Sequence, residues 1–329
     1  MTERLRIDET DAKILHQLLK ESRTSFTELS KICNITVGAV RMRYKKLWRT
    51  GVINGEIMQV NPQSLSYKFI CDINILTSAE NESNVLTFLA SKPYIQYTIK
   101  TYGKYNITTK VTLTNMQELA AILVDLETND SIKQVDTMIW AEVSNTDYPE
   151  NLLIKFNNGT ETLQSNNLQH NRAVSNLPVE MDALDRKIAK IISQHSRTTF
   201  RKIAEQTGIS TKNVIQRYKR LRGNVLTLSA VTVNLKKLGY NAHATIFVKV
   251  VNKSKVQEIQ NQLVSMPNIL NVTRLIGPYD LEVILTLQEF EELFKFKEQM
   301  RKNDNIENTE IYIGPALQSY PLNIFQSLL

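Results

Sequence analysis

The chain is a tandem repeat, with its second half about 174 positions behind the first. Residues 11–47 align without a gap with residues 185–221, and 13 of these 37 positions are identical. The run Ser22-Arg23-Thr24 recurs as Ser196-Arg197-Thr198, and the same offset places Gly103 on Gly277. Repetition at this period indicates duplicated domains rather than a solenoid, whose repeat is much shorter. Any function of one half is therefore expected twice.

The net charge of +7 is unevenly distributed along the 329 residues. Residues 1–55 carry 11 basic and 6 acidic side chains, and residues 178–230 carry 11 and 4. The segment 56–150 has a net charge of −6, and the segment 231–329 is neutral. The basic excess thus lies at the head of each repeat, which is typical of a polyanion-binding module attached to a body with another role.

Composition excludes several classes of protein. No apolar run approaches the roughly 20 residues that span a bilayer, and the charged start lacks a signal-peptide pattern. We therefore expect a cytoplasmic protein with no membrane partner. Cys33 and Cys71 have no cysteine counterpart in the other repeat, so neither a disulfide framework nor a metal site is expected. The pattern predicts no cofactor.

Each basic module has the periodicity of a winged helix-turn-helix. In the first, two short amphipathic helices precede a turn at Asn34, and Thr36 is placed to cap a third helix from Val37 to Arg49. In the second, Gly208 occupies the turn and Ser210 the cap. A glycine or asparagine at that turn suits the left-handed conformation it requires.

The third helices are rich in basic residues and contain no acidic ones. A recognition helix places its N-terminal residues on base edges and its flanks on phosphates. The residues expected to approach bases are Thr36, Gly38, Arg41, Met42, Ser210, Lys212, Asn213 and Gln216. The residues expected to hold phosphates are Arg43, Lys45, Lys46, Arg217, Lys219 and Arg220. The sequence therefore predicts double-stranded DNA as the partner.

The segment after each module reads strand-helix-strand-strand-helix-strand, which is the ferredoxin-like order and gives an α+β fold class. One face of such a sheet is left uncovered by helices and must be buried, so self-association through the sheets is expected, either as an intrachain pseudo-dimer or as a homodimer. The predicted winged helix-turn-helix domains are residues 1–60 and 178–233, and the predicted ferredoxin-like domains are residues 61–156 and 234–329. A polar Asn/Gln-rich linker, residues 157–177, is expected between the two repeats.

In order and spacing, these motifs resemble the Lrp/AsnC, or feast/famine, transcription regulators. The resemblance rests on Ser22-Arg23-Thr24, the Arg43 to Leu47 helix end, the Gly51 to Gly55 segment and the loop Gly277-Pro278-Tyr279-Asp280. It implies a sequence-specific DNA-binding regulator whose ferredoxin-like domain, the RAM domain of this family, dimerises. The family usually carries one copy per chain, whereas this chain carries two.

The resemblance also implies an amino-acid effector near the Gly-x-Tyr-Asp loop. The candidate residues are Gly277, Tyr279 and Asp280, with Gly103 and Tyr105 in the first repeat. A carboxylate can pair with the ammonium of an amino acid. In the first repeat, Asn106 stands where the family has aspartate, so that site is expected to be weaker.

Three alternatives compete with a DNA-binding regulator. The ferredoxin-like order is also that of RNA-binding modules, which use the open sheet face, and a small-molecule sensor without DNA contact is a further option. Catalysis is the third, but the sequence lacks a phosphate loop, a dinucleotide fingerprint and a cluster of metal ligands, and its four histidines are scattered. The sequence therefore predicts a protein that is not an enzyme.

Overall fold

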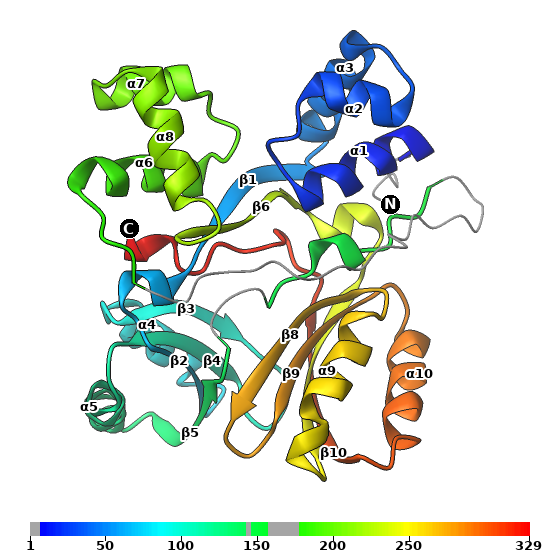
Figure 1. Ribbon diagram of the computed structural model, residues 1–329. Helices are drawn as coiled ribbons and strands as arrows, with labels where there is room; N and C mark the ends of the chain where they lie inside the picture. The colour runs from blue at the N-terminus through cyan, green and yellow to red at the C-terminus, as the bar shows by residue number, and fades with distance from the viewer. Residues whose placement is uncertain (1–6, 143–145, 157–177) are drawn as a thin grey trace.

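The computed structural model describes residues 7–142, 146–156 and 178–329, and the predicted linker at 157–177 lies outside them. Two helical modules stand at one end of the molecule and two helix-backed sheets at the other (Figure 1). This is the α+β architecture expected from the repeat. Among the described residues, no helix is long and apolar enough to cross a membrane.

Each helical module consists of three helices. They are α1 (Glu9–Lys20), α2 (Phe26–Cys33) and α3 (Val37–Arg49), then α6 (Ala183–Gln194), α7 (Phe200–Thr207) and α8 (Thr211–Leu221). At the turn before the third helix, Asn34 and Gly208 have φ of 52° and 73°, the left-handed conformation that closes a helix C-terminus. The hydroxyls of Thr36 and Ser210 then accept hydrogen bonds from the backbone three residues on, as N-caps do.

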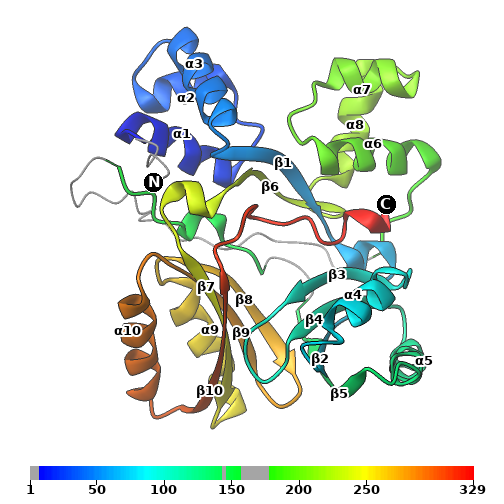
Figure 2. The same cartoon turned by 180° about the vertical axis from the view of Figure 1, so that it is seen from behind.

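The strand after each module pairs with its counterpart from the other repeat. Strand β1 (Ile53–Val60) runs antiparallel to β6 (Leu226–Val233) as an isolated two-stranded ribbon. These strands, at the ends of the predicted winged helix-turn-helix domains, join the two modules to each other. The ribbon lies between the modules and the sheets (Figure 2).

The two ferredoxin-like domains follow the predicted order of elements. The first has β2 (Phe69–Thr77), α4 (Glu82–Ala90), β3 (Ile95–Lys100), β4 (Ile107–Leu113), α5 (Met116–Glu127) and β5 (Ile132–Trp140). The second has β7 (Ala242–Val250), α9 (Val256–Val264), β8 (Ile269–Ile276), β9 (Leu281–Leu287), α10 (Phe290–Arg301) and β10 (Ile306–Pro315). Short 3-10 helices cover Pro62–Leu65, Pro149–Asn151, Leu235–Leu238, Lys253–Lys255 and Gln326–Leu328.

The two sheets join at one edge and turn their open faces toward each other. Hydrogen bonds between β5 and β8, at Ile139–Ile276 and Trp140–Leu275, give one sheet of order β10-β7-β9-β8-β5-β2-β4-β3. The helix-facing sides hold separate apolar cores. The open faces share a third core, which includes Met138 and Trp140 from one half and Phe247 and Tyr312 from the other. The two open faces of this one chain therefore cover each other.

The segment after each last strand crosses to the opposite half. After β5, Asn151 donates from its side-chain amide to the carbonyls of Val264 and Ile269 in the second domain. After β10, the ring of Phe325 packs edge-on against Trp140 of the first domain, with ring centroids 6.3 Å apart. Residues of both exchanged segments line the space between the sheets.

The repeated Ser-Arg-Thr run forms a reciprocal contact between the helical modules. The guanidinium of Arg23 donates to the carbonyls of Ser196 and Thr198 and stacks 4.4 Å from the ring of Phe200. In the same way, Arg197 donates to the carbonyls of Ser22 and Thr24. Its guanidinium stacks 5.0 Å from the ring of Phe26. The hydroxyls of Ser22 and Ser196 meet on the local two-fold axis at 2.6 Å. The identities at these positions are explained by this symmetry.

We expect Arg23→Ala and Arg197→Ala each to lower the free energy of unfolding by about 1–3 kcal/mol. Each change removes charge-assisted hydrogen bonds to partly buried carbonyls and a stacked cation. Urea denaturation measures the effect, and the double variant should lose less than the sum because the two residues share one interface. Arg201→Ala, whose side chain is 86% exposed, is the control. Single variants as stable as this control would contradict the reciprocal arrangement.

Candidate functional site

A buried aspartate ties the third helix of each helical module to its first helix. Asp11 is fully buried and accepts hydrogen bonds from Arg43 at 2.8 Å and Lys46 at 2.9 Å. Asp185 repeats the arrangement with Arg217 at 2.7 Å. These three cations, predicted to hold phosphates, are partly buried and engaged within their own module. Their side chains stabilise the recognition helix against the first helix.

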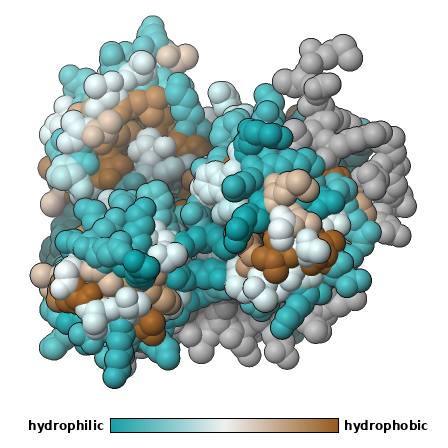
Figure 3. Space-filling model, turned by 90° about the horizontal axis from the view of Figure 1, so that it is seen from above, coloured by the Kyte–Doolittle hydropathy of each residue, from teal (hydrophilic) through white to brown (hydrophobic). Residues whose placement is uncertain are grey.

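The other residues predicted to contact DNA lie at the surface. The exposed set is Thr36, Gly38, Arg41, Met42, Lys45, Ser210, Lys212, Asn213, Gln216, Lys219 and Arg220. Within the described chain, Arg41, Lys45, Lys212 and Lys219 form no ion pair, whereas Arg220 pairs with Asp185. The end of the molecule that bears the two modules is mostly hydrophilic (Figure 3). This face is the candidate nucleic-acid interface.

The polar residue of each Gly-x-Tyr-Asp loop is engaged with its own domain. The carboxylate of Asp280 accepts from the backbone N–H of Val250 at 2.8 Å and from Lys253 Nζ at 2.5 Å. In the first repeat, the amide oxygen of Asn106 accepts from the backbone N–H of Thr77 at 2.9 Å. An amino-acid effector at these loops stays a prediction, and the geometry shows that Asp280 already has a cationic partner.

The other loop residues predicted to bind an effector lie where the two domains meet. The backbone of Gly103 packs so closely on the ring of Tyr312 that an added Cβ would fall 2.3 Å from it. Tyr105 is buried. On the other side, Gly277 lies against the backbone carbonyl of Thr137, and the Tyr279 hydroxyl bonds to a glutamate of β10. These loops therefore build the interface between the halves.

A cavity of about 120 Å³ lies between the two open sheet faces. Its walls come from both sheets, from the C-terminal segment and from the ribbon, where Gln59, Val60 and Thr227 reach it. Because the open faces cover each other around this space, they do not form a flat platform that could bind RNA. The RNA-binding alternative, which requires those faces, is therefore disfavoured.

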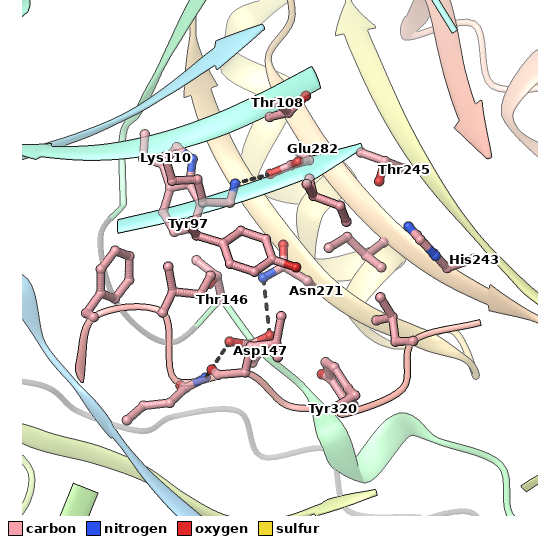
Figure 4. A pocket seen from close by; sticks show the side chains of 18 of the residues that line it. Tyr97, Thr108, Lys110, Thr146, Asp147, His243, Thr245, Asn271, Glu282 and Tyr320 are labelled. Atoms are coloured by element: carbon pink, nitrogen blue, oxygen red, sulfur yellow. Dashed lines mark hydrogen bonds and ion pairs between the residues drawn. The ribbon is translucent and has the colours of Figure 1, made fainter. Parts of the chain in front are cut away.

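Charged side chains from both halves meet in the cavity. Lys110 of β4 lies with its Nζ 2.5 Å from Asp72 and 3.9 Å from Glu282 of β9 (Figure 4). Trp140 Nε1 donates to the other oxygen of Asp72 at 2.7 Å. Burial opposes the charge of Lys110, but attraction to the two carboxylates outweighs it and raises the pKa of the ammonium. Burial raises the pKa of Glu282 to about 7, although Lys110 lowers it in part.

A buried histidine lines the same cavity. His243 Nδ1 lies 2.7 Å from the carbonyl oxygen of Pro315, so this nitrogen carries the proton and Nε2 is left as an acceptor. Burial lowers the pKa of His243, and the imidazole is neutral near pH 7. The ring fits because Gly314 lies beneath it, where a Cβ would fall 2.3 Å from the imidazole.

Sequence reasoning did not identify the cavity residues as a site. The signal present in the sequence was a lysine and two acids at strand positions whose side chains face away from the helices: Asp72, Lys110 and Glu282. Charged residues are rare on a sheet face that must be buried. Only the facing of the two sheets shows that the residues come together.

Comparison with known proteins matches the two helical modules to known families. A winged helix-turn-helix DNA-binding model matches residues 7–54, and an AsnC-type helix-turn-helix model matches residues 181–222. The HTH-type transcriptional regulator FL11 of Pyrococcus furiosus is 32% identical over 134 residues, covering 40% of this chain and 88% of the relative. The regulatory protein AsnC of Escherichia coli is 32% identical over 135 residues, covering 40% and 89%. Each match is about one repeat long.

Over its whole length, the chain is similar in fold to the siroheme decarboxylase NirDL. The TM-score is 0.61 at 14% identity, and the match covers 97% of this chain and 96% of that one. The prediction that this chain is not an enzyme is contradicted by this likeness, because the same duplicated architecture is found in a decarboxylase. A cavity that forms only when the two halves meet leaves no catalytic motif in the sequence.

We expect Glu282→Gln to stabilise the protein in a pH-dependent way. The pKa of this carboxyl is raised in the folded state from 4.5 to about 7, so the folded state binds the proton more tightly and loses stability as pH rises through that window. The glutamine side chain cannot ionise. The free energy of unfolding of the variant should therefore exceed that of the parent by on the order of 2 kcal/mol at about pH 8, and the two should be nearly equal at about pH 4. The titratable groups that face Glu282 are Lys110, Asp72 and Asp147.

Urea denaturation at the two pH values measures this difference. Glu258→Gln is the matched control, because that carboxylate is 53% exposed on α9 and should show no such dependence. A difference between variant and parent that stays constant with pH would contradict the assignment.

Proposed function

Because the chain belongs to the Lrp/AsnC family of helix-turn-helix regulators, we propose that it is a transcription regulator that binds double-stranded DNA through two modules carried by one polypeptide. The observation that carries the proposal is the set of exposed cations on α3 and α8 that no acid in the described chain neutralises: Arg41, Lys45, Lys212 and Lys219. Such cations bind phosphates and release counterions.

The arrangement of the modules supports one extended DNA target rather than two independent ones. The reciprocal hydrogen bonds of Arg23 and Arg197 and the β1–β6 ribbon relate the recognition helices by a local two-fold axis. Two-fold related modules read half-sites related by the same symmetry. Several exposed residues differ between the two helices; Met42, for example, aligns with Gln216. We therefore propose that the two half-sites differ in sequence.

The comparison with NirDL suggests a second ligand class, which the cavity does not fit. One of its structures contains an iron-uroporphyrin III analogue, and such a macrocycle is large and bears several carboxylates. A space of about 120 Å³ holds on the order of ten non-hydrogen atoms. Its cation, Lys110, is already paired with Asp72, and Glu282 would repel further carboxylates. We therefore propose no tetrapyrrole chemistry for this cavity.

The DNA-binding proposal predicts a steep dependence of affinity on salt. If six or more phosphates are bound, affinity should fall roughly a thousandfold between about 50 and 200 mM salt. Replacing Arg41 and Lys45 by alanine, or Lys212 and Lys219, should weaken binding. Each phosphate that the variant no longer neutralises should reduce the slope of log affinity against log salt by about 1. Fluorescence anisotropy with DNA selected from a random-sequence pool measures both quantities.

Lys236→Ala, outside the helical modules, is the control for charge alone. The proposal fails if the four alanine changes together leave DNA affinity and its salt slope at the level of this control. It also fails if the protein binds single-stranded RNA more tightly than duplex DNA.

A further inference from the structure

The charges in the cavity have no counterpart across the repeat. Thr245 stands where the first half has Asp72, Ile284 where it has Lys110, and Thr108 where the second half has Glu282. Threonine and isoleucine show that neutral side chains suffice at these positions of the sheet. Packing of the two sheets therefore does not require these charged residues, and each of them occurs in only one of the two repeats.

Glu282 lacks the partners that a buried carboxylate needs. It is 5% exposed, and within the described chain its carboxylate accepts no hydrogen bond. Its nearest cation is Lys110 at 3.9 Å, and that ammonium is closer to Asp72, at 2.5 Å. A buried charge left in this state lowers stability. Neither carboxylate oxygen is among the fully buried atoms that lack a partner, so the carboxylate opens onto the cavity, where the ammonium of a ligand could reach it.

The rest of the cavity wall indicates the chemistry of that ligand. The Nε2 of His243 adds an acceptor, and the carboxylate of Asp147 in the same wall accepts hydrogen bonds from the amides of Gln59 and Asn271. The apolar wall is aromatic, and the ring of Tyr97 projects into the space (Figure 4). The other rings that line it are Trp140, Phe247, Tyr312, Tyr320 and Phe325. Acceptors together with aromatic faces favour an organic cation.

We propose that the cavity between the two sheets binds a small primary amine with an apolar or aromatic body, whose ammonium group pairs with Glu282. The cavity volume limits the ligand to on the order of ten non-hydrogen atoms. A free carboxylate on the ligand is disfavoured, because Lys110 is already neutralised by Asp72. This site is distinct from the Gly-x-Tyr-Asp loops, and its test needs no DNA.

Calorimetric titration of the full chain at about pH 8 tests the proposal, using phenethylamine as the probe. The neutral analogue 2-phenylethanol and the zwitterion L-phenylalanine, which adds a carboxylate to the same skeleton, should each bind at least tenfold more weakly. Glu282→Gln should weaken phenethylamine binding at least tenfold while the protein stays folded, as its urea transition would show. Glu258→Gln, the exposed matched variant, should bind the probe as the parent does.

Three results would overturn the proposal. Phenethylamine that does not bind at millimolar concentration shows that the cavity is not an amine site. Equal binding of 2-phenylethanol shows that only apolar packing matters, and affinity unchanged in folded Glu282→Gln shows that the ammonium lies elsewhere. Thr108 lies in the cavity wall at the position that corresponds to Glu282 in the other repeat. Thr108→Ala changes the shape of the cavity without removing a charge, so it should change the affinity for phenethylamine less than Glu282→Gln does.

Discussion

The burial of the two open sheet faces against each other is the interaction on which the rest of the molecule depends. A ferredoxin-like sheet with helices on one side exposes apolar residues on the other, and here each half covers the other with residues such as Trp140 and Phe247. The two sheets join at β5 and β8, and each half contributes its terminal segment to the other. The cavity lies between the two faces. It also removes the face that an RNA-binding module of this order would use.

The identities between the repeats reflect what a two-fold arrangement of helical modules needs. Asp11 and Arg43 hold the recognition helix to the first helix, and the same pair recurs in the second module. Arg23 and Ser22 are retained because each meets the other repeat across the axis. Several exposed positions on the recognition helices differ instead, as Met42 and Gln216 do, although Lys45 recurs as Lys219. Packing has thus fixed the frame of the two modules and left their outer surfaces free to recognise different sequences.

Fusion of the repeats in one chain permits an asymmetry that a homodimer could not have. In a symmetric pair, a glutamate at one position of the open face appears twice, and two buried carboxylates without enough cations would be costly. Here Thr108 occupies the position that corresponds to Glu282, so the charge occurs once. The single lysine at position 110 is likewise unmatched. The cavity therefore has distinct ends, and a ligand can bind it in one orientation.

The sequence by itself determined the elements and their order, because these follow from local causes. Thr36 caps a helix from position 37, Asn34 takes the left-handed turn, and alternation of apolar residues marks each strand. The sequence did not show that Arg43 would be held by Asp11, nor that Lys110 and Glu282, 172 positions apart, would share one cavity. Such pairs depend on how whole domains face one another, and only the tertiary structure decided that.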